Sequence, residues 1–193
     1  MAKIIDDKLI LRETTNSATI RNNLVPQKIG IFVWRLLRKR IAVKEELDRR
    51  GIDLDSLLCP ICNDAVESVD HAIISCKYAQ EVWIGILKWW NLPLQSGITI
   101  DEMIKGSNSI VSAPRFKKIW QAVVWTTCYL LWKNRNLKVF QNDVWATSKI
   151  VNEVQVKSFE WIKNRSRKLS SSWHQWISSP SSPNVLDVLL DPG

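Results

Sequence analysis

Glycine is scarce in this sequence, with 6 of 193 residues against about 7% in average proteins. Proline (7), phenylalanine (4) and tyrosine (2) are also few. A chain with so few turn-forming residues is unlike an all-β protein with many tight turns and favours helices. The 4 cysteines are too few for a small disulfide-stabilised scaffold.

Long hydrophobic runs are missing as well. The most apolar stretch, 119–132, is 14 residues long and still contains Gln121, Thr126 and Thr127. A bilayer span needs about 20 apolar residues, and a run of this length is more typical of a buried helix. The charged start of the chain, Met1 to Asp7, is unlike a signal peptide. We therefore expect a soluble intracellular protein, in the nucleus or cytoplasm, that does not bind membranes.

What the sequence has in excess is basic charge and tryptophan. Lysine and arginine number 27 against 19 acidic residues, which gives +8, and 11 residues are tryptophan. The 46% apolar content excludes a disordered chain. The length fits one domain or two small ones.

Apolar residues recur at helical spacing in five segments, so the fold class is expected to be mainly α. The predicted helices cover 28–40, 43–50, 78–91, 115–142 and 148–168, with a short helix after Thr99. Pro26 and Pro114 suit first turns, Gly51 suits a helix C-terminus, and Ser148 is the expected N-cap of the last helix.

The longest predicted helix has two apolar faces, which indicates a helix enclosed in the core. One carries Trp120, and the other carries Trp125, Trp132 and Val139 at seven-residue spacing. We interpret these tryptophans as core residues and not as a base-stacking surface. The expected order is a polar segment (1–23), a zinc-binding domain (24–93), a linker (94–113), a helical hairpin packing on that domain (114–169) and a loose Ser/Pro-rich tail (170–193) that Trp173 and Trp176 pin back.

A cysteine and histidine cluster has the spacing of a metal site. Cys59, Cys62, His71 and Cys76 follow the pattern C-x2-C-x8-H-x4-C. Three thiolates and one imidazole suit a single Zn²⁺ ion, and four protein ligands leave no open position, so the role is structural. The alternatives are ordinary thiols, an iron–sulfur cluster or a redox C-x-x-C pair. The fourth cysteine, Cys128, lies among helical apolar residues and is interpreted as core.

Several short motifs accompany this cluster. They are Val25-Pro26-Gln27-Lys28-Ile29, Phe32-Val33-Trp34-Arg35-Leu36-Leu37, Leu47-Asp48-Arg49-Arg50-Gly51-Ile52, Leu58-Cys59-Pro60-Ile61-Cys62, Glu67-Ser68-Val69-Asp70-His71, Ser75-Cys76 and Val82-Trp83. Together they resemble the zinc-binding domain that follows the reverse transcriptase in plant LINE-type (non-LTR) retrotransposons. The resemblance covers about 24–91 and continues loosely through 132–140 and 173–176. It implies zinc bound by the same four residues. Ile41-Ala42 departs from the Leu-Pro-Thr usual there.

The resemblance implies a parent polyprotein with a polymerase and an endonuclease, but this sequence carries the residues of neither. Two-metal polymerase chemistry needs clustered carboxylates, and Asp6-Asp7 is an isolated pair in a short amphipathic stretch. Motifs for phosphate binding, serine hydrolysis or zinc proteolysis are missing. His174 stands in a Ser-rich tail without a nucleophile nearby. The chain is therefore predicted to have no catalytic residues and no small-molecule substrate.

The positive charge flanks the predicted zinc site. Segments 1–58 and 101–193 carry +4 and +6, whereas 59–100 carries −2 and its loop includes Asp64, Glu67 and Asp70. Phosphate contacts to RNA or DNA are therefore expected from the flanking helices, with weak sequence specificity. The expected contact residues are Lys28, Arg35, Arg38, Lys39, Lys44, Arg49, Arg50, Lys163, Arg165, Arg167 and Lys168. A zinc-stabilised module that binds a protein partner, and a decayed fragment without function, are the alternatives.

Overall fold

A long central helix, α6 (Pro114–Gln141), organises the molecule. The computed structural model describes residues 21–93, 99–105, 114–166 and 171–181, and over these residues it contains helices and no β-strand. The other elements are α2 (Gln27–Leu37), α3 (Lys44–Asp48), the π-helical turn η1 (His71–Ser75), α4 (Lys77–Trp89), α5 (Ile100–Lys105), α7 (Thr147–Arg165) and α8 (Trp173–Ser178). The predicted mainly α fold is confirmed.

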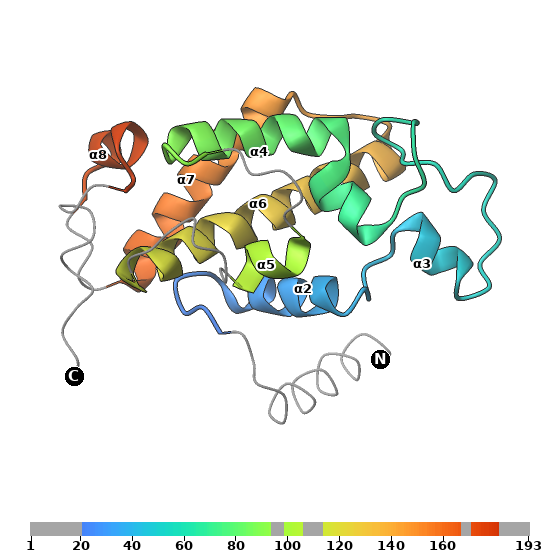
Figure 1. Ribbon diagram of the computed structural model, residues 1–193, viewed down its shortest axis with the longest axis horizontal. Helices are drawn as coiled ribbons and strands as arrows, with labels where there is room; N and C mark the ends of the chain where they lie inside the picture. Colours follow the sequence, from blue (N-terminus) through green and yellow to red (C-terminus); the bar gives the residue numbers. More distant parts are fainter. Residues whose placement is uncertain (1–20, 94–98, 106–113, 167–170, 182–193) are drawn as a thin grey trace.

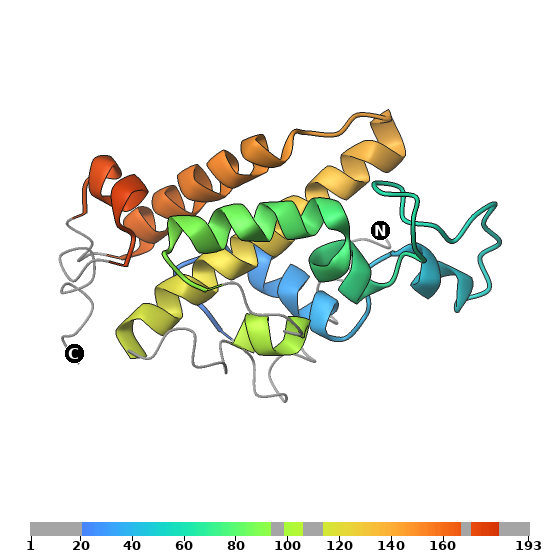
Figure 2. The same cartoon turned by 45° about the horizontal axis from the view of Figure 1, so that its top comes forward.

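Most of the other helices lie around α6, whereas α3 stands to one side (Figures 1 and 2). At 1.5 Å per residue its 28 residues are about 42 Å long. The α7 helix returns along it and α4 packs on α7, while α2, α5 and η1 contact α6 directly. The η1 turn lies near the C-terminal end of α6, and α8 lies at the opposite end of the molecule, where it contacts α7.

The middle of α6 is buried on every side. Residues 122–128 have almost no exposed surface, and they include Trp125 and Cys128. Thr126 and Thr127 lie in the same stretch, and their hydroxyls donate to the carbonyls of Ala122 and Val123 at 2.7 and 2.9 Å, which satisfies them inside the apolar core. Burial raises the pKa of the Cys128 thiol. The enclosed helix predicted from two apolar faces is thus present, and Cys128 is a core residue.

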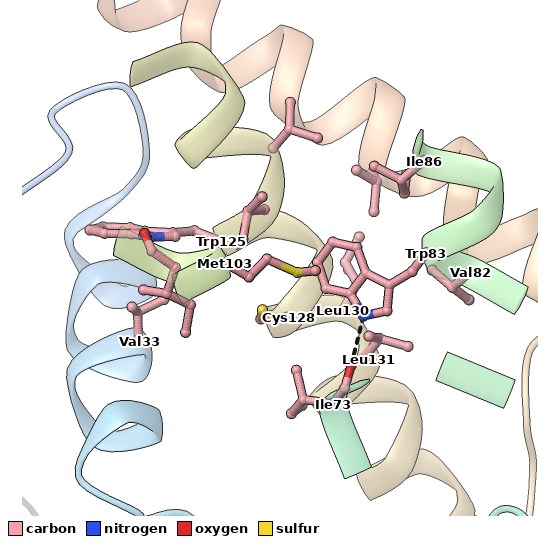
Figure 3. Packing of buried hydrophobic residues seen from close by; sticks show 14 of the residues in the cluster. Val33, Ile73, Val82, Trp83, Ile86, Met103, Trp125, Cys128, Leu130 and Leu131 are labelled. Atoms are coloured by element: carbon pink, nitrogen blue, oxygen red, sulfur yellow. Dashed lines mark hydrogen bonds between the residues drawn. The ribbon is translucent and has the colours of Figure 1, made fainter. Parts of the chain in front are cut away.

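Residues from four elements meet beside this stretch (Figure 3). Met103 of α5 reaches between Trp125 and the ring of Trp83, which comes from α4. The indole N–H of Trp83 donates to the carbonyl of Ile73 in η1 at 2.7 Å. This bond fixes the η1 turn against α4 from inside the core.

The second apolar face of α6 is not buried along its whole length. Trp125 is fully buried and Trp132 half-buried, but Val139 is 41% exposed and Phe140 78% exposed. The last turns of α6 extend past α2 and α4 (Figures 1 and 2), so they have fewer helices to pack against. The expectation that Val139 belongs to the core was wrong for this reason.

Most predicted helix limits agree with the structure to within a few residues. The α2 helix ends at Leu37 and not at Arg40, because Lys39 adopts a left-handed backbone with φ 53°. Gly51 has φ +76°, the conformation expected of a glycine after a helix. Ser148 is not an N-cap: α7 begins at Thr147, and Ala146 holds the N-cap position without a side-chain hydrogen bond.

Part of the expected loose tail forms a docked helix. Ser172 and Gln175 form a reciprocal capping box at the start of α8. Trp176 is fully buried, and its indole N–H donates to the Gln155 carbonyl of α7 at 3.0 Å. Burial of this one indole, together with the cap, orders a segment whose Ser-rich composition indicated a loose chain.

Some predictions fall on residues outside this description. They concern the segment 1–20 with Asp6-Asp7, parts of the linker, Arg167, Lys168 and the tail from 182. Over the residues that are described, none of the helices combines the length and the apolar character needed to cross a bilayer.

Candidate metal centre

The first two candidate ligands lie on a tight loop, residues 57–67, that we call the metal hairpin. Its two arms are joined by hydrogen bonds from the Cys59 N–H to the Ala65 carbonyl (2.8 Å) and from the Glu67 N–H to the Leu57 carbonyl (2.9 Å). At the tip, the Asn63 N–H donates to the Cys59 carbonyl at 2.9 Å, and Asn63 has φ 57°. Asparagine tolerates this left-handed conformation better than most residues. The turn brings Cys59 and Cys62 to the same side.

The other two ligands lie at the two ends of η1. The Ser68 hydroxyl accepts from the His71 N–H at 3.0 Å and starts the turn. The Cys76 N–H then donates to the His71 carbonyl at 2.8 Å, a wide turn that spans five residues. Such π-type turns are frequent at functional sites. Here the wide turn places His71 and Cys76 on one side, directly before α4.

The four candidate ligands converge on one point. Their ligand atoms, three Sγ and one ring nitrogen, all lie within 4.8 Å of one another, which is close enough to bind one metal ion. The Cys62 Sγ and the His71 Nε2 are 3.2 Å apart. Cys59 and Cys76 are buried, and the other two are half-buried. Three sulfurs and one imidazole form the donor set of tetrahedral Zn²⁺ sites, so these residues fit zinc.

The surroundings of Cys76 favour its thiolate, the form that binds metals. A hydrogen bond from the Cys59 thiol, helped by the backbone N–H groups of Tyr78 and Ala79 at the start of α4, lowers the pKa of Cys76. The same hydrogen bond and burial raise the pKa of Cys59. Zinc binds thiolates, so its binding releases the protons that these cysteines carry.

Glu67 does not contribute to an acidic surface on the metal hairpin, although the sequence grouped it with Asp64 and Asp70. Its side chain is fully buried and pairs with Arg135 of α6, with N···O distances of 2.6 Å. The other two are exposed, and Asp64 forms an exposed ion pair with Lys77 at 2.6 Å. The acidic loop is therefore less acidic at its surface than its composition implied.

The predicted nucleic-acid contacts fall into two separate groups. The first lies on α2, on α3 and in the turns that follow them, where Lys28, Arg38, Lys39 and Arg50 are exposed, Arg35 and Lys44 are half-buried, and Arg49 pairs with Glu45 and Glu46. The second is the last turn of α7, where Lys163 and Arg165 are exposed. Because α7 runs antiparallel to α6, this second group lies at the end of the molecule opposite η1 (Figures 1 and 2). The structure does not bring the two groups together.

Two features near these groups were missed in the sequence. Arg40 lies over the ring of Trp34 with its guanidinium carbon 5.5 Å from the ring centre, and Arg38 lies 5.0 Å from the same ring. The run of three basic residues, 38–40, was the available signal for Arg40. Arg135 was missed because nothing local distinguishes a buried arginine from a solvated one.

Comparison with known families agrees with this geometry. Residues 8–83 match a family described as zinc-binding in reverse transcriptase. The matched segment contains all four candidate ligands, α2, α3 and the metal hairpin, and it supports a zinc-binding domain in this part of the chain. No curated protein and no solved structure shows significant similarity to the chain.

Proposed function

We propose that Cys59, Cys62, His71 and Cys76 bind one zinc ion whose role is structural. The convergence of four ligand atoms within 4.8 Å, inside a segment that matches a zinc-binding family, is the observation that carries this proposal. Four protein ligands complete a tetrahedral shell, so the ion has no position left for a substrate. The module is therefore non-catalytic. The motifs around the ligands support an origin in a LINE-type reverse transcriptase.

The zinc proposal is tested by metal analysis of the purified chain. We expect one Zn²⁺ per chain, and loss of that zinc in Cys62→Ser and His71→Ala. Cys128→Ser is the matched control, since this cysteine is buried in the core away from the cluster. A metal content near zero in the unaltered chain, or equal zinc in His71→Ala, would refute the proposal.

The second part of the proposal is that the module binds RNA or DNA through the basic residues of α2, α3 and their following turns. We call this surface the basic corner; it consists of Lys28, Arg35, Arg38, Lys39, Arg40, Lys44, Arg49 and Arg50. Eight cations from adjacent segments support it, because phosphate contacts are supplied mainly by lysine and arginine. Such contacts read the backbone, so binding is weakly sequence-specific and falls steeply with salt.

Charge reversal at the basic corner tests this part. Lys28, Lys39 and Arg50 are exposed, and their joint replacement by glutamate removes three phosphate contacts without disturbing the core. Each lost contact reduces the slope of log affinity against log salt by about 0.7–0.9. The matched control replaces Lys117, Lys118 and Lys163, which are exposed and lie outside the basic corner, by glutamate. A gel-shift titration across salt in which both variants bind like the parent would contradict the proposal.

A protein-binding module is the second candidate, and one observation favours it. Phe140 is 78% exposed, and its neighbours Val139 and Val144 are 41% and 42% exposed at the turn between α6 and α7. Exposed apolar residues that lie together are typical of protein interfaces. Light scattering or sedimentation that detects a dimer, lost in Phe140→Ser, together with no nucleic-acid affinity at physiological salt, would favour this candidate.

A further inference from the structure

Glu67 is a fully buried carboxylate at the end of the metal hairpin. Its Oε2 accepts the Lys44 backbone N–H at 2.9 Å, and its backbone carbonyl accepts the Glu45 N–H at 3.2 Å. Its own N–H donates to the Leu57 carbonyl of the opposite arm. One residue therefore ties together both arms of the hairpin and the start of α3.

The charge of Glu67 is balanced by Arg135 of α6, 68 residues away in the sequence. The Nε and one terminal nitrogen of Arg135 donate to the two carboxylate oxygens, each at 2.6 Å. The side chain of Arg135 is 7% exposed, and its guanidinium lies 5.0 Å from the centre of the Trp132 ring. A two-pronged arginine–carboxylate contact fixes both distance and direction.

The metal hairpin has few other attachments to the helices. Over residues 51–68, only Cys59 and Glu67 are buried. Leu58 and Val66, which face each other across the hairpin, are 41% and 47% exposed. Apart from Cys59, the apolar packing of the hairpin is limited to partly buried residues such as Ile61. Its two buried residues attach the hairpin to the rest of the molecule. Cys59 does so as a candidate metal ligand, and Glu67 does so through Arg135 of α6.

We propose that Glu67 and Arg135 form a latch that holds the metal hairpin where Cys59 and Cys62 meet His71 and Cys76. Both are then positioning residues for the zinc site, a role that rests on the zinc binding proposed above. The latch acts directly on the hairpin arm, whereas η1 and α4 hold His71 and Cys76. By thermodynamic linkage, zinc binding in turn stabilises the contact between the hairpin and α6.

The test measures zinc affinity of the full chain by competition with a chromophoric chelator. The variants are Glu67→Gln and Arg135→Lys. The first removes the negative charge of the carboxylate, and the second keeps a positive charge but cannot form the two-pronged contact. Both are expected to bind zinc about 10–100-fold more weakly, as when groups supporting metal ligands are removed. In the double variant the loss should be no larger than in the worse single variant, because both remove one interaction.

Two controls separate positioning from general destabilisation. Asp64→Asn breaks the exposed ion pair between the hairpin and Lys77. Solvent screens such pairs, so the zinc affinity of this variant should stay within about twofold of that of the parent chain. Trp176→Ala weakens the core far from the hairpin and should leave zinc affinity unchanged. The thiolate-to-metal absorption of the Co²⁺-loaded variants should still report three cysteine ligands at saturation.

The outcomes discriminate between the proposals. Weak zinc binding in both latch variants, with normal binding in both controls, supports the latch. Parental affinity in Glu67→Gln and Arg135→Lys overturns it, and so does an equal loss in Trp176→Ala. A parent chain that binds no zinc overturns the zinc site and the latch together, whereas a parent that binds zinc with unaffected latch variants overturns the latch alone.

Discussion

The two ends of α6 are held together by different means. At one end, Trp90 lies edge-on to Trp120 with ring centres 5.0 Å apart, and Trp176 of α8 lies 6.3 Å from Trp90. Trp89 also packs on Trp176 at 5.3 Å and donates its indole N–H to the Trp176 carbonyl at 3.1 Å. We call these four residues the tryptophan end. The rings join the end of α4 to α6 and α8, and Trp176 also contacts Phe159 of α7 with ring centres 6.1 Å apart.

At the other end, the metal hairpin buries little apolar area, since Leu58 and Val66 are exposed. Two buried residues in the span 51–68 cannot offset the conformational entropy of ordering it, at about 1–2 kcal/mol per residue. A cluster of four candidate metal ligands and a buried ion pair lie where the other end has indoles. The comparison teaches that a chain can form one end by hydrophobic burial and the other by a few strong polar contacts, with α6 connecting them.

Zinc removal should have the largest effect and should act on the metal end. Structural zinc contributes on the order of 10 kcal/mol in isolated zinc fingers. We expect chelation, or Cys62→Ser, to abolish hydrogen-exchange protection of residues 57–76, while residues around Trp90, Trp120 and Trp176 remain protected. An unchanged melting curve and full protection after chelation would show that the two ends do not differ in this way.

Removal of Trp176 should have the next largest effect, on the tryptophan end. This indole is fully buried, and replacing such a residue by alanine costs about 3–5 kcal/mol. We expect Trp176→Ala to unfold at lower denaturant while it binds zinc with parental affinity. Trp173→Ala is the control, because that ring is 44% exposed and should cost much less. Equal midpoints for the two variants would contradict the assigned role of Trp176.

Loss of the α8 cap should have a smaller effect at the same end. Ser172 accepts the Gln175 N–H at 3.2 Å and closes the capping box. We expect Ser172→Ala to cost about 1 kcal/mol, read from the denaturant midpoint. Ser178→Ala removes a hydroxyl at the other end of α8 and serves as the control. A loss comparable to that of Trp176→Ala would indicate that the cap, and not the indole, docks this helix.

The smallest effect is expected from the exposed ion pair in the metal hairpin. Lys77 and Asp64 are 2.6 Å apart, but their side chains are 67% and 63% exposed. Solvent screens such an exposed pair, so Lys77→Gln should hardly change the melting temperature. Arg135→Gln, which leaves Glu67 buried without its partner, should cost about 3–5 kcal/mol. Similar losses of stability in the two variants would show that burial does not decide how much an ion pair contributes to stability.

Local sequence features were sufficient for much of the fold and for the choice of candidate ligands. The spacing of Ile29, Val33 and Leu36 in α2, and of Val82 and Ile86 in α4, predicted buried faces that the structure contains. Helical periodicity and cysteine spacing involve residues within a few turns of one another, so they are readable from short windows. Ser148 was misassigned because a polar residue at a plausible position does not show whether its hydroxyl reaches the backbone.

The sequence by itself determined where the helices form, that the middle of α6 is buried, and which four residues meet at one point. The tertiary structure decided the pairing of Glu67 with Arg135, the docking of Trp176 on α7, and the separation of the two basic groups. Each of these contacts and separations involves residues that are tens of positions apart in the sequence. The local sequence around a charged residue is the same whether its side chain is buried or solvated, so it does not reveal the partner. Only the packing of the helices around α6 assigns those partners.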